Sequence, residues 1–384
     1  MFKRTPLYAA HQRLGGKLIE FGGWEMPVQY SSIMDEHHAV RKHAGLFDIS
    51  HMGEVRFSGP AAEAFLNYIL TNDIRKLALG QGQYTQLCNE RGGTVDDLYA
   101  YRLRELEYLL IVNASRIEAD GAWMEGCLAA FPQRGLVVLE DQSSQYGAIA
   151  LQGPRAPEII GAVASGPASA GTRVAQAIEL KKNEIAVFSC QGEEIYVART
   201  GYTGEDGFEI VAPNHLLEGL WERLLAAGHP CCLQPAGLGA RDTLRTEMGY
   251  PLYGHELDEE TSPIEAGVGF FVALEKPEFV GRAPLVAQKQ GGLTRKCVAF
   301  RMADKTPPPR PHYPIYGVGP DAVLIGQVSS GTQSPSLGCG IGLGYVPPAY
   351  AKPGTPIAIE IRGRRVPAVV VSKPLYRRSG AQPF

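Results

Sequence analysis

The chain has 384 residues, of which 45% are hydrophobic and 20% are charged, and its formal net charge is −3. This composition is typical of a soluble globular protein, and the length predicts two or three domains rather than one core. The balanced charge argues against attraction to nucleic acid or membrane surfaces, and no apolar run reaches the roughly 18 residues of a membrane-spanning helix.

Glycine and proline are frequent and widely spread, which favours many short strands and turns. Helices are expected at residues 33–43, 61–70, 115–131 and 215–227. Strands are expected at residues 54–57, 94–102, 108–113, 146–151, 194–199, 208–211, 298–301 and 366–371. After about residue 285 the pattern holds only strands and turns, which predicts a separate C-terminal β-domain.

One strand–turn–helix pattern occurs twice in the chain. Residues 55–60 and residues 149–154 each end a predicted strand with a Gly-Pro pair and lead into a helix. Proline suits the first turn of a helix. The repetition predicts two related α+β halves, and convergent turn chemistry is the alternative.

Residues 92–102 (Gly-Gly-Thr-Val-Asp-Asp-Leu-Tyr-Ala-Tyr-Arg) place two adjacent acids in a predicted strand. Because side chains alternate between the faces of a strand, Asp97 shares a face with Tyr99 and Tyr101 while Asp96 points the other way. The two acids are therefore not expected to form a paired-carboxylate dyad. A carboxylate in line with two tyrosines suits a flat, nitrogen-rich ligand, and the alternative is an Asp that binds turn amides.

A glycine-rich loop at residues 199–207 runs into a short strand that contains Glu209. A carboxylate inside an apolar strand is costly unless it is paired or hydrogen-bonded. A planar carboxylate suits a ligand edge with two adjacent N–H donors, such as the edge of a pterin. Glu205 and Asp206, within the loop, are expected to be solvated or to form turns.

Residues 235–245 read as a loop that enters a helix, with Arg241 near the helix start. This arginine is placed to bind a carboxylate bidentately. The alternative is a salt bridge, for example with Glu247.

The seven cysteines are scattered, and no CxxC pair occurs. This pattern argues against a disulfide framework or a zinc site and favours a reducing compartment. No apolar run follows the N-terminal residues, so no signal peptide is expected and the predicted location is cytoplasmic. The densest histidine cluster, at residues 36–43, lacks the spacing of metal ligands, so no metal site is expected.

Taken together, these segments resemble the aminomethyltransferase (T-protein) family of the glycine cleavage system almost from end to end. The matching N-terminal blocks are residues 5–8, 21–27 and 45–53. The matching core blocks are residues 92–102, 201–209 and 237–241, and the C-terminal blocks are residues 329–331, 334–337 and 373–377.

The resemblance implies an α+β fold of three domains, arranged like a cloverleaf around a folate-binding funnel. A central folate-binding domain is expected at residues 1–50 and 145–284, with an inserted α+β domain at residues 51–144 that carries the Asp97 strand. A C-terminal β-barrel or jelly-roll-like domain is expected at residues 285–384.

The implied reaction transfers an aminomethyl carbon from the lipoyl arm of a partner, the H-protein, to tetrahydrofolate as co-substrate. Ammonia is released and 5,10-methylenetetrahydrofolate forms, without a metal. The resemblance makes Asp97 the catalytic residue. The implied folate-binding residues are Met52, Tyr84, Tyr101, Asn113, Tyr202, Glu209, Arg241 and Arg377.

Two positions depart from the family pattern. Phe270 stands where a tryptophan is common, with an expected effect on packing at the pocket. Lys181 and Lys182 fall where an aromatic pair often sits, and a solvated turn is the alternative. The rival functions are a tetrahydrofolate-dependent demethylase of the same fold and, from another class, a non-catalytic folate-binding protein related to iron–sulfur cluster maintenance.

Overall fold

A computed structural model describes residues 2–303, 306–319 and 322–378 of the chain. Two compact units are present, and each is built from segments that are distant in sequence. Unit 1 comprises Met1–Cys88, Val95–Arg241 and Ala273–Val280. Unit 2 comprises Asn89–Thr94, Asp242–Val272 and Gly281–Phe384. The three-domain boundaries expected from the sequence stay a prediction.

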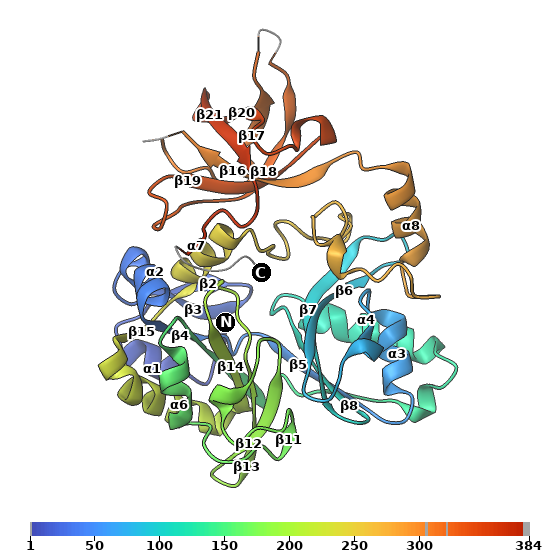
Figure 1. The fold of residues 1–384 in the computed structure, drawn as a ribbon, viewed down its shortest axis with the longest axis vertical. Coiled ribbons are helices and arrows are strands. Elements are labelled where there is room, and N and C mark those ends of the chain that lie inside the picture. The colour runs from blue at the N-terminus through green and yellow to red at the C-terminus, as the bar shows by residue number, and fades with distance from the viewer. Residues whose placement is uncertain (1, 304–305, 320–321, 379–384) are drawn as a thin grey trace. The chain divides into compact units, whose positions relative to one another are not determined.

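The larger sheet of unit 1 has seven strands in the order β11-β12-β13-β14-β10-β4-β15 (Figure 1). In chain order these strands are β4 (Ala44–Asp48), β10 (Tyr146–Gln152), β11 (Ala170–Gly171), β12 (Ile185–Cys190), β13 (Glu193–Ala198), β14 (Gly207–Pro213) and β15 (Leu233–Pro235). Strands β10 and β14 pair antiparallel, with Ala150 opposite Glu209. The strands expected at residues 146–151, 194–199 and 208–211 are confirmed.

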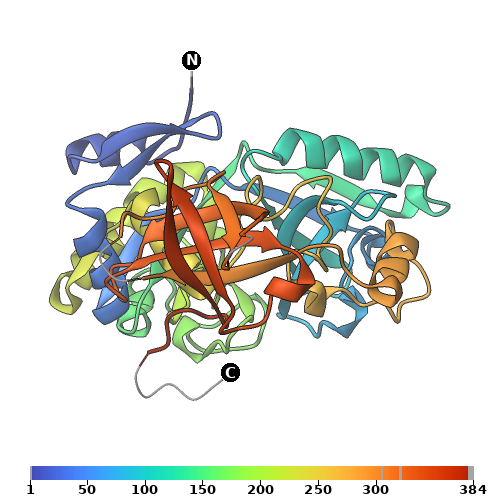
Figure 2. The ribbon, with the colours of Figure 1, turned by 90° about the horizontal axis from the view of Figure 1, so that it is seen from above.

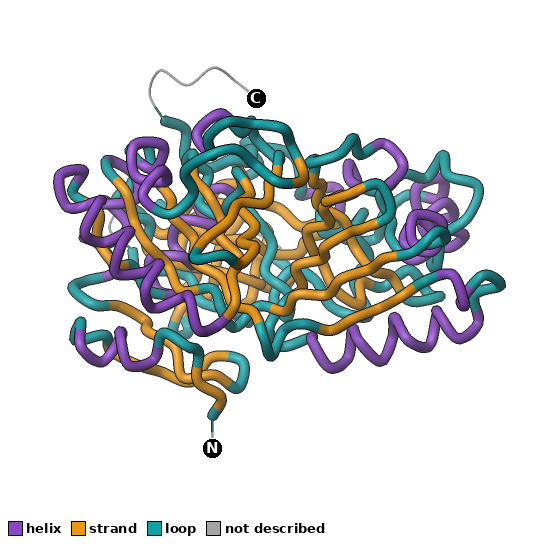
Figure 3. The backbone as a smooth tube through the Cα atoms, turned by 90° about the horizontal axis from the view of Figure 1, so that it is seen from below, coloured by secondary structure: helices purple, strands orange, loops and turns teal. Residues whose placement is uncertain are grey.

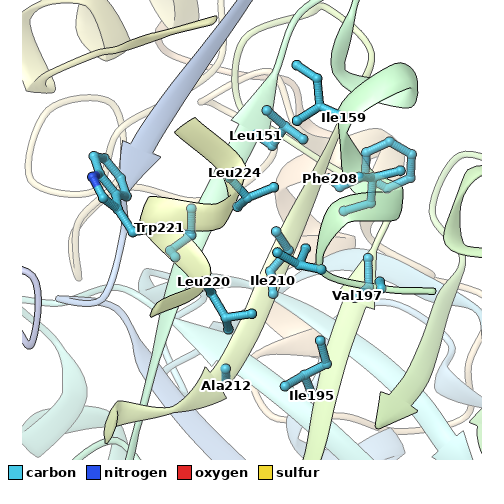
Figure 4. Packing of buried hydrophobic residues seen from close by; sticks show 14 of the residues in the cluster. Leu151, Ile159, Ile195, Val197, Phe208, Ile210, Ala212, Leu220, Trp221 and Leu224 are labelled. Atoms are coloured by element: carbon cyan, nitrogen blue, oxygen red, sulfur yellow. The ribbon is translucent and has the colours of Figure 1, made fainter. Parts of the chain in front are cut away.

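Helix α6 (Asn214–Gly228) covers one face of this sheet because its apolar side chains recur at helical spacing. Leu220, Trp221 and Leu224 are buried in one cluster with strand residues such as Phe208 and Ile210 (Figure 4). Burying a side chain of this size contributes roughly 1.5–3 kcal/mol. Since alternate residues of β14 point to this core, Glu209 is directed to the opposite face of the sheet.

The second sheet of unit 1 has five strands in the order β6-β7-β8-β5-β9. The strands are β5 (Gly53–Ser58), β6 (Gly82–Cys88), β7 (Thr94–Arg104), β8 (Glu107–Val112) and β9 (Val138–Asp141). Helices α3 (Ala62–Ile69) and α4 (Ile117–Ala130) lie beside it, and α4 is the long teal helix of Figure 2. Phe65 and Met124 of these helices share a core with Leu98 of β7. The other face of β7 therefore carries Asp97.

The N-terminal part of unit 1 forms a three-stranded sheet in the order β1-β3-β2. Its elements are β1 (Lys3–Arg4), α1 (Tyr8–Arg13), β2 (Lys17–Phe21), β3 (Trp24–Gln29) and α2 (Ile33–Lys42). Helix α5 (Ala156–Ile159) follows β10. In Figure 3 these helices are purple and the strands orange. Single 3-10 turns occur at Ile74–Lys76, Arg134–Leu136, Ile160–Ala162, Ala177–Glu179, His229–Cys231, Gly269–Phe271 and Pro348–Tyr350.

The two Gly-Pro turns noted in the sequence have the same backbone geometry. Gly59, between β5 and α3, has φ +115°, and Gly153, between β10 and α5, has φ +129°. A Cβ at Gly59 would lie 2.4 Å from the carbonyl oxygen of Leu136, and one at Gly153 would lie 2.5 Å from that of His43. Only glycine fits both the dihedral angle and the close backbone approach. Both turns connect a strand to a helix, and the two related α+β halves stay a prediction.

The segment Ala273–Val280 packs on unit 1 as a strap, although the residues before it belong to unit 2. Lys276 is 1% exposed. Its ammonium group donates hydrogen bonds to the carbonyl oxygens of Leu70, at 2.6 Å, and Asn72, at 3.1 Å. The backbone N–H of Val280 donates to the carbonyl of Tyr68.

Unit 2 contains a closed barrel in the order β16-β19-β18-β17-β20-β21. Its strands are β16 (Lys296–Met302), β17 (Pro314–Gly317), β18 (Leu324–Gln333), β19 (Gly340–Val346), β20 (Pro356–Ile361) and β21 (Arg364–Val371). The predicted C-terminal β-domain is confirmed. The prediction that strands and turns alone follow residue 285 was wrong, because α8 (Arg282–Gly291) extends past that point. Helix α7 (Leu238–Met248) begins in unit 1 and continues in unit 2.

Candidate active site

Strand β7 presents Asp97 on the face of the five-stranded sheet that the helices leave uncovered. The hydroxyl of Tyr84, on β6, donates to Oδ2 of Asp97 at 2.7 Å, and the amide Nδ2 of Asn113, just after β8, donates to Oδ1 at 3.0 Å. Burial and the nearby charge of Asp96 raise the pKa of Asp97 to about 7, and these two hydrogen bonds oppose the rise. Asp97 is therefore a carboxyl group that changes charge near neutral pH.

Asp96 points to the opposite face of β7 and is fully buried, in agreement with the alternation argument. The two acids are nevertheless coupled. Nδ2 of Asn113 donates to Oδ1 of Asp96 at 2.9 Å as well as to Asp97, and the backbone N–H of Asn113 donates to Oδ2 of Asp96 at 3.0 Å. The two acids are thus linked through one amide of Asn113, which lies at the strand end.

A chain of hydroxyl groups connects Tyr101 with Glu209. Oγ1 of Thr200 donates to Oε2 of Glu209 at 2.8 Å and lies 3.0 Å from the Tyr101 hydroxyl. Since the single hydroxyl hydrogen of Thr200 goes to the carboxylate, Tyr101 is the donor to Thr200. Gly82 makes room for this arrangement, because a Cβ there would lie 2.3 Å from the Tyr101 ring. Among the described residues no hydrogen bond to the second oxygen of Glu209 is present, so this oxygen is placed to accept a donor from a ligand.

Arg241 lies in the first turn of α7, and its guanidinium stands over the ring of Tyr202 at 4.8 Å from the centroid. Its buried Nη1 has no hydrogen-bond partner among the described residues. Burial lowers the pKa of Arg241, and the charge of Glu209 opposes the shift. An arginine held flat by an aromatic ring with a donor to spare is suited to an anionic ligand. Glu247, the alternative partner, accepts hydrogen bonds from the hydroxyls of Ser334 and Ser336.

Met52 follows the turn between β4 and β5, and its backbone N–H donates to the carbonyl of Ile49. His51 beside it is 3% exposed, with its ring edge-on to Phe21. Burial lowers the pKa of His51 to about 4, so the imidazole is neutral at physiological pH. The connection between β4 and β5 therefore carries an apolar and a neutral polar side chain.

Seven of the predicted folate-binding residues belong to unit 1, together with Asp97: Met52, Tyr84, Tyr101, Asn113, Tyr202, Glu209 and Arg241. Arg377 belongs to unit 2, where it is exposed, and its role stays a prediction.

The structure tests three expectations about other residues named in the sequence analysis. Glu205 was expected to be solvated or turn-forming; its side chain is 5% exposed and pairs with Arg41 at 2.9 Å, so solvation was the wrong expectation. Phe270, expected to affect pocket packing, is 93% exposed and meets the ring of Phe271. Lys181 and Lys182 are exposed beside Asn183, which has φ +66°, as the solvated-turn alternative predicts.

Sequence reasoning missed Thr200 and Asp120. Thr200 lies at the start of the glycine-rich loop, two residues after β13, and carries no further signal in the sequence. Asp120 is completely buried on α4. An acidic residue among the apolar positions of that helix was the sequence signal that could have identified it. Within the described residues, no group of three or more His, Cys, Asp or Glu side chains is arranged to hold a metal ion. None of the described helices has the length and apolar character needed to cross a membrane.

Comparison with known proteins gives a consistent result. The GCVT N-terminal domain model matches residues 7–276, and the glycine cleavage T-protein C-terminal barrel domain model matches residues 295–377. The chain belongs to the glycine cleavage T-protein family. An aminomethyltransferase of Lysinibacillus sphaericus is 46% identical over 377 residues, with 98% of each chain covered. One of Desulfitobacterium hafniense is 45% identical over 380 residues, covering 98% of this chain and 99% of the other.

A solved structure extends the relationship to three dimensions. The glycine cleavage system aminomethyltransferase T from Bartonella henselae has a TM-score of 0.87 and 34% sequence identity, with 98% of each chain covered. The family, the α+β fold with its C-terminal barrel, and the aminomethyltransferase class of enzyme predicted from the sequence are confirmed. The individual site residues remain predictions that rest on the T-protein pattern and on the geometry of unit 1.

Proposed function

We propose that this T-protein family member transfers the aminomethyl carbon carried on the lipoyl arm of a glycine cleavage H-protein to tetrahydrofolate. The bonds from this carbon to the lipoyl sulfur and to the amino nitrogen break, the dihydrolipoyl thiol and ammonia leave, and two folate nitrogens bond to the carbon to form 5,10-methylenetetrahydrofolate. The observation that carries the proposal is Asp97, a carboxyl group with a pKa of about 7, held between Tyr84 and Asn113.

The side chains fit a folate in their chemistry. Glu209 has one oxygen bound by Thr200 and the other free for the N–H donors of a pterin edge. Arg241, stacked on Tyr202 with an unused buried donor, suits the anionic glutamyl tail. The opposite chemistry of these two anchors would fix the direction in which the ligand lies.

In the proposed reaction Asp97 stands near folate N5 and the aminomethyl carbon. Nitrogen attack on that carbon passes through a cationic, iminium-like centre, and an ionised Asp97 stabilises the positive charge as it develops. Tyr84 and Asn113 keep the carboxyl group in one orientation, so the charge is in place before the reaction starts. A carboxyl with a pKa near 7 is also able to accept a proton at physiological pH.

The lipoylated H-protein, the tetrahydrofolate co-substrate and the cytoplasmic location are parts of this proposal. The demethylase alternative would use the same folate residues with a free methyl donor. None of the features described above favours that alternative.

The direct test is tetrahydrofolate-dependent ammonia release from aminomethyl-loaded, lipoylated H-protein, measured for the wild type and for Asp97→Asn. We expect rapid release by the wild type and a loss of about 10²–10⁴-fold in the variant, the range for a positioned acid–base group. Tetrahydrofolate binding, measured by calorimetry, should change little. Full turnover by Asp97→Asn would remove Asp97 from the mechanism, and no release by the wild type would reject the proposed reaction.

A further inference from the structure

Behind Asp97, on the helix-covered face of β7, two further carboxyl groups are enclosed. Asp96 from β7 and Asp120 from α4 are both 0% exposed, and their carboxyl groups lie close enough for each to shift the pKa of the other. Two buried carboxyl groups at such close range avoid the repulsion of like charges when one of them keeps its proton. Neither oxygen of Asp120 is reached by an N–H or O–H donor among the described residues, so Asp120 is the member that carries the proton.

The charge of the pair follows from its surroundings. Burial and the charge of Asp96 raise the pKa of Asp120 to about 10. Burial also raises the pKa of Asp96, while its interaction with Asp120 and the two hydrogen bonds from Asn113 oppose this rise. Because Asn113 donates to Asp96 and no donor reaches Asp120 among the described residues, a single negative charge on the pair is located on Asp96.

An ionised Asp96 has consequences for Asn113. Because both of its oxygens are acceptors, Asp96 binds the backbone N–H and the side-chain NH2 group of Asn113 at the same time. These bonds fix the orientation of the Asn113 side-chain amide. The same Nδ2 donates to Oδ1 of Asp97 at 3.0 Å and to the carbonyl oxygen of Asp97 at 2.9 Å. A neutral Asp96 would lose one acceptor and release the amide to rotate.

We infer that Asp96 and Asp120 are positioning residues for the transfer reaction. Asp120 supplies the proton that keeps Asp96 an acceptor, Asp96 orients Asn113, and Asn113 orients Asp97. The inference rests on the proposed function, because it concerns the residue at which that reaction is placed. It adds to the proposed function that Asp96 and Asp120 influence the protonation of Asp97.

The described ionisable groups with the largest effects on Asp97 belong to this arrangement. Asp96 lies on its own strand and raises the pKa of Asp97, and Tyr84 from β6 lowers it through a hydrogen bond. Asp120 on α4 lies close enough for its own pKa to respond to Asp97, and Nε of Arg116 lies 3.8 Å from Oδ1 of Asp120. The charge on Asp96 therefore helps to set the pH at which Asp97 ionises.

The test compares pH profiles of kcat/KM for ammonia release in four variants: Asp96→Asn, Asp120→Asn, Asp120→Ala and, as a control, Glu125→Gln on the exposed side of α4. Wild-type activity should rise with pH through about 7. Asp96→Asn should move this rise to lower pH by about one unit, a tenfold change in proton affinity, since the neighbouring charge is gone. The maximal rate should also fall, because Asn113 loses an acceptor.

The two changes at Asp120 separate proton donation from packing. Asp120→Asn still offers an N–H to Asp96, so its profile should keep the wild-type position, as should that of Glu125→Gln. Asp120→Ala removes the donor, so its pH profile should shift to lower pH, as the profile of Asp96→Asn does. An unshifted profile in Asp96→Asn, or equal shifts in Asp120→Asn and Asp120→Ala, would overturn the inference.

A second measurement does not depend on turnover. Carboxyl 13C titration of Asp97 in 13C-aspartate-labelled protein should give a lower pKa in Asp96→Asn than in the wild type. If the wild type releases no ammonia but this shift is present, the proposed function fails and the coupling stands. If ammonia is released and the shift is absent, the coupling fails and the proposed function stands.

Discussion

At the scale of single residues, Glu209 and Arg241 divide the recognition of the ligand between them. One oxygen of Glu209 is bound by Thr200, and a donor of Arg241 is unused. Hydrogen bonds to charged groups contribute roughly 1.5–3 kcal/mol, so these contacts have a measurable share of folate affinity. Their loss should appear in binding rather than in the chemical step, because neither residue touches Asp97 in the contacts described above.

We therefore expect Glu209→Gln to weaken tetrahydrofolate binding by roughly 10–100-fold, the equivalent of that free energy, with kcat nearly unchanged. Calorimetric titration and steady-state kinetics measure the two effects separately. Glu194→Gln is the matched control, because its side chain is 47% exposed on the neighbouring strand β13 and pairs with Arg104. Equal affinity in Glu209→Gln and the wild type would exclude Glu209 from the ligand contacts.

The sequence correctly predicted the face to which a side chain points where the alternation of a strand decides it. The alternation of β7 placed Asp97 with the two tyrosines and Asp96 on the other side. It failed for Asn113 and Asp120, whose contacts with Asp96 depend on strand pairing and on the way α4 packs. Glu205 was misjudged for the same reason, since its partner Arg41 is 164 residues away in the chain.

At the scale of elements, the Gly-Pro turn after β10 is a point where the backbone tolerates no side chain. Gly153→Ala should destabilise the protein by roughly 1–3 kcal/mol, because φ of +129° is strained for alanine and the Cβ meets the carbonyl of His43. A thermal melt should show a lower midpoint. Gly161→Ala is the control, as a Cβ there meets nothing within 4 Å. Similar melting of the two variants would contradict this account.

Long, strongly patterned elements were predictable, and short or interrupted ones were not. Helices α2, α3, α4 and α6 lie within one or two residues of the expected ranges. Helix α8 was missed because it is framed by Gly281 and Gly292, both with positive φ, and contains Pro284 near its start, so the local composition resembles a turn. The strap Ala273–Val280 has no regular structure, and only tertiary contacts define it.

At the scale of the whole molecule, buried acids make stability depend on pH. Glu54 is 1% exposed, neither of its oxygens has a hydrogen-bond partner among the described residues, and burial raises its pKa well above the ordinary value. The folded protein keeps this proton at pH values where the unfolded chain has released it. Its contribution to the free energy of unfolding is therefore complete below the ordinary carboxyl pKa and is lost as the pH rises toward the folded pKa.

Glu54→Gln removes this linkage without changing the shape of the side chain. We expect the melting temperature of the variant to exceed that of the wild type by an amount that grows from pH 5 to pH 8, at about 1.4 kcal/mol per pKa unit as an upper bound. Comparing the variant with the wild type cancels the opposite trend from His51, whose pKa is lowered. A difference that stays constant with pH would show that Glu54 is ionised in the folded protein.

The strap Ala273–Val280 also bears on the order in which the molecule forms during synthesis. The carbonyl groups of Leu70 and Asn72 leave the ribosome early, but Lys276, which binds them, emerges some two hundred residues later. Between these events the chain has already produced Asp242–Val272, which belongs to the other unit. The segment that follows α3 therefore lacks these hydrogen-bond partners while Asp242–Val272 is being made. In this protein, folding cannot follow translation one unit at a time.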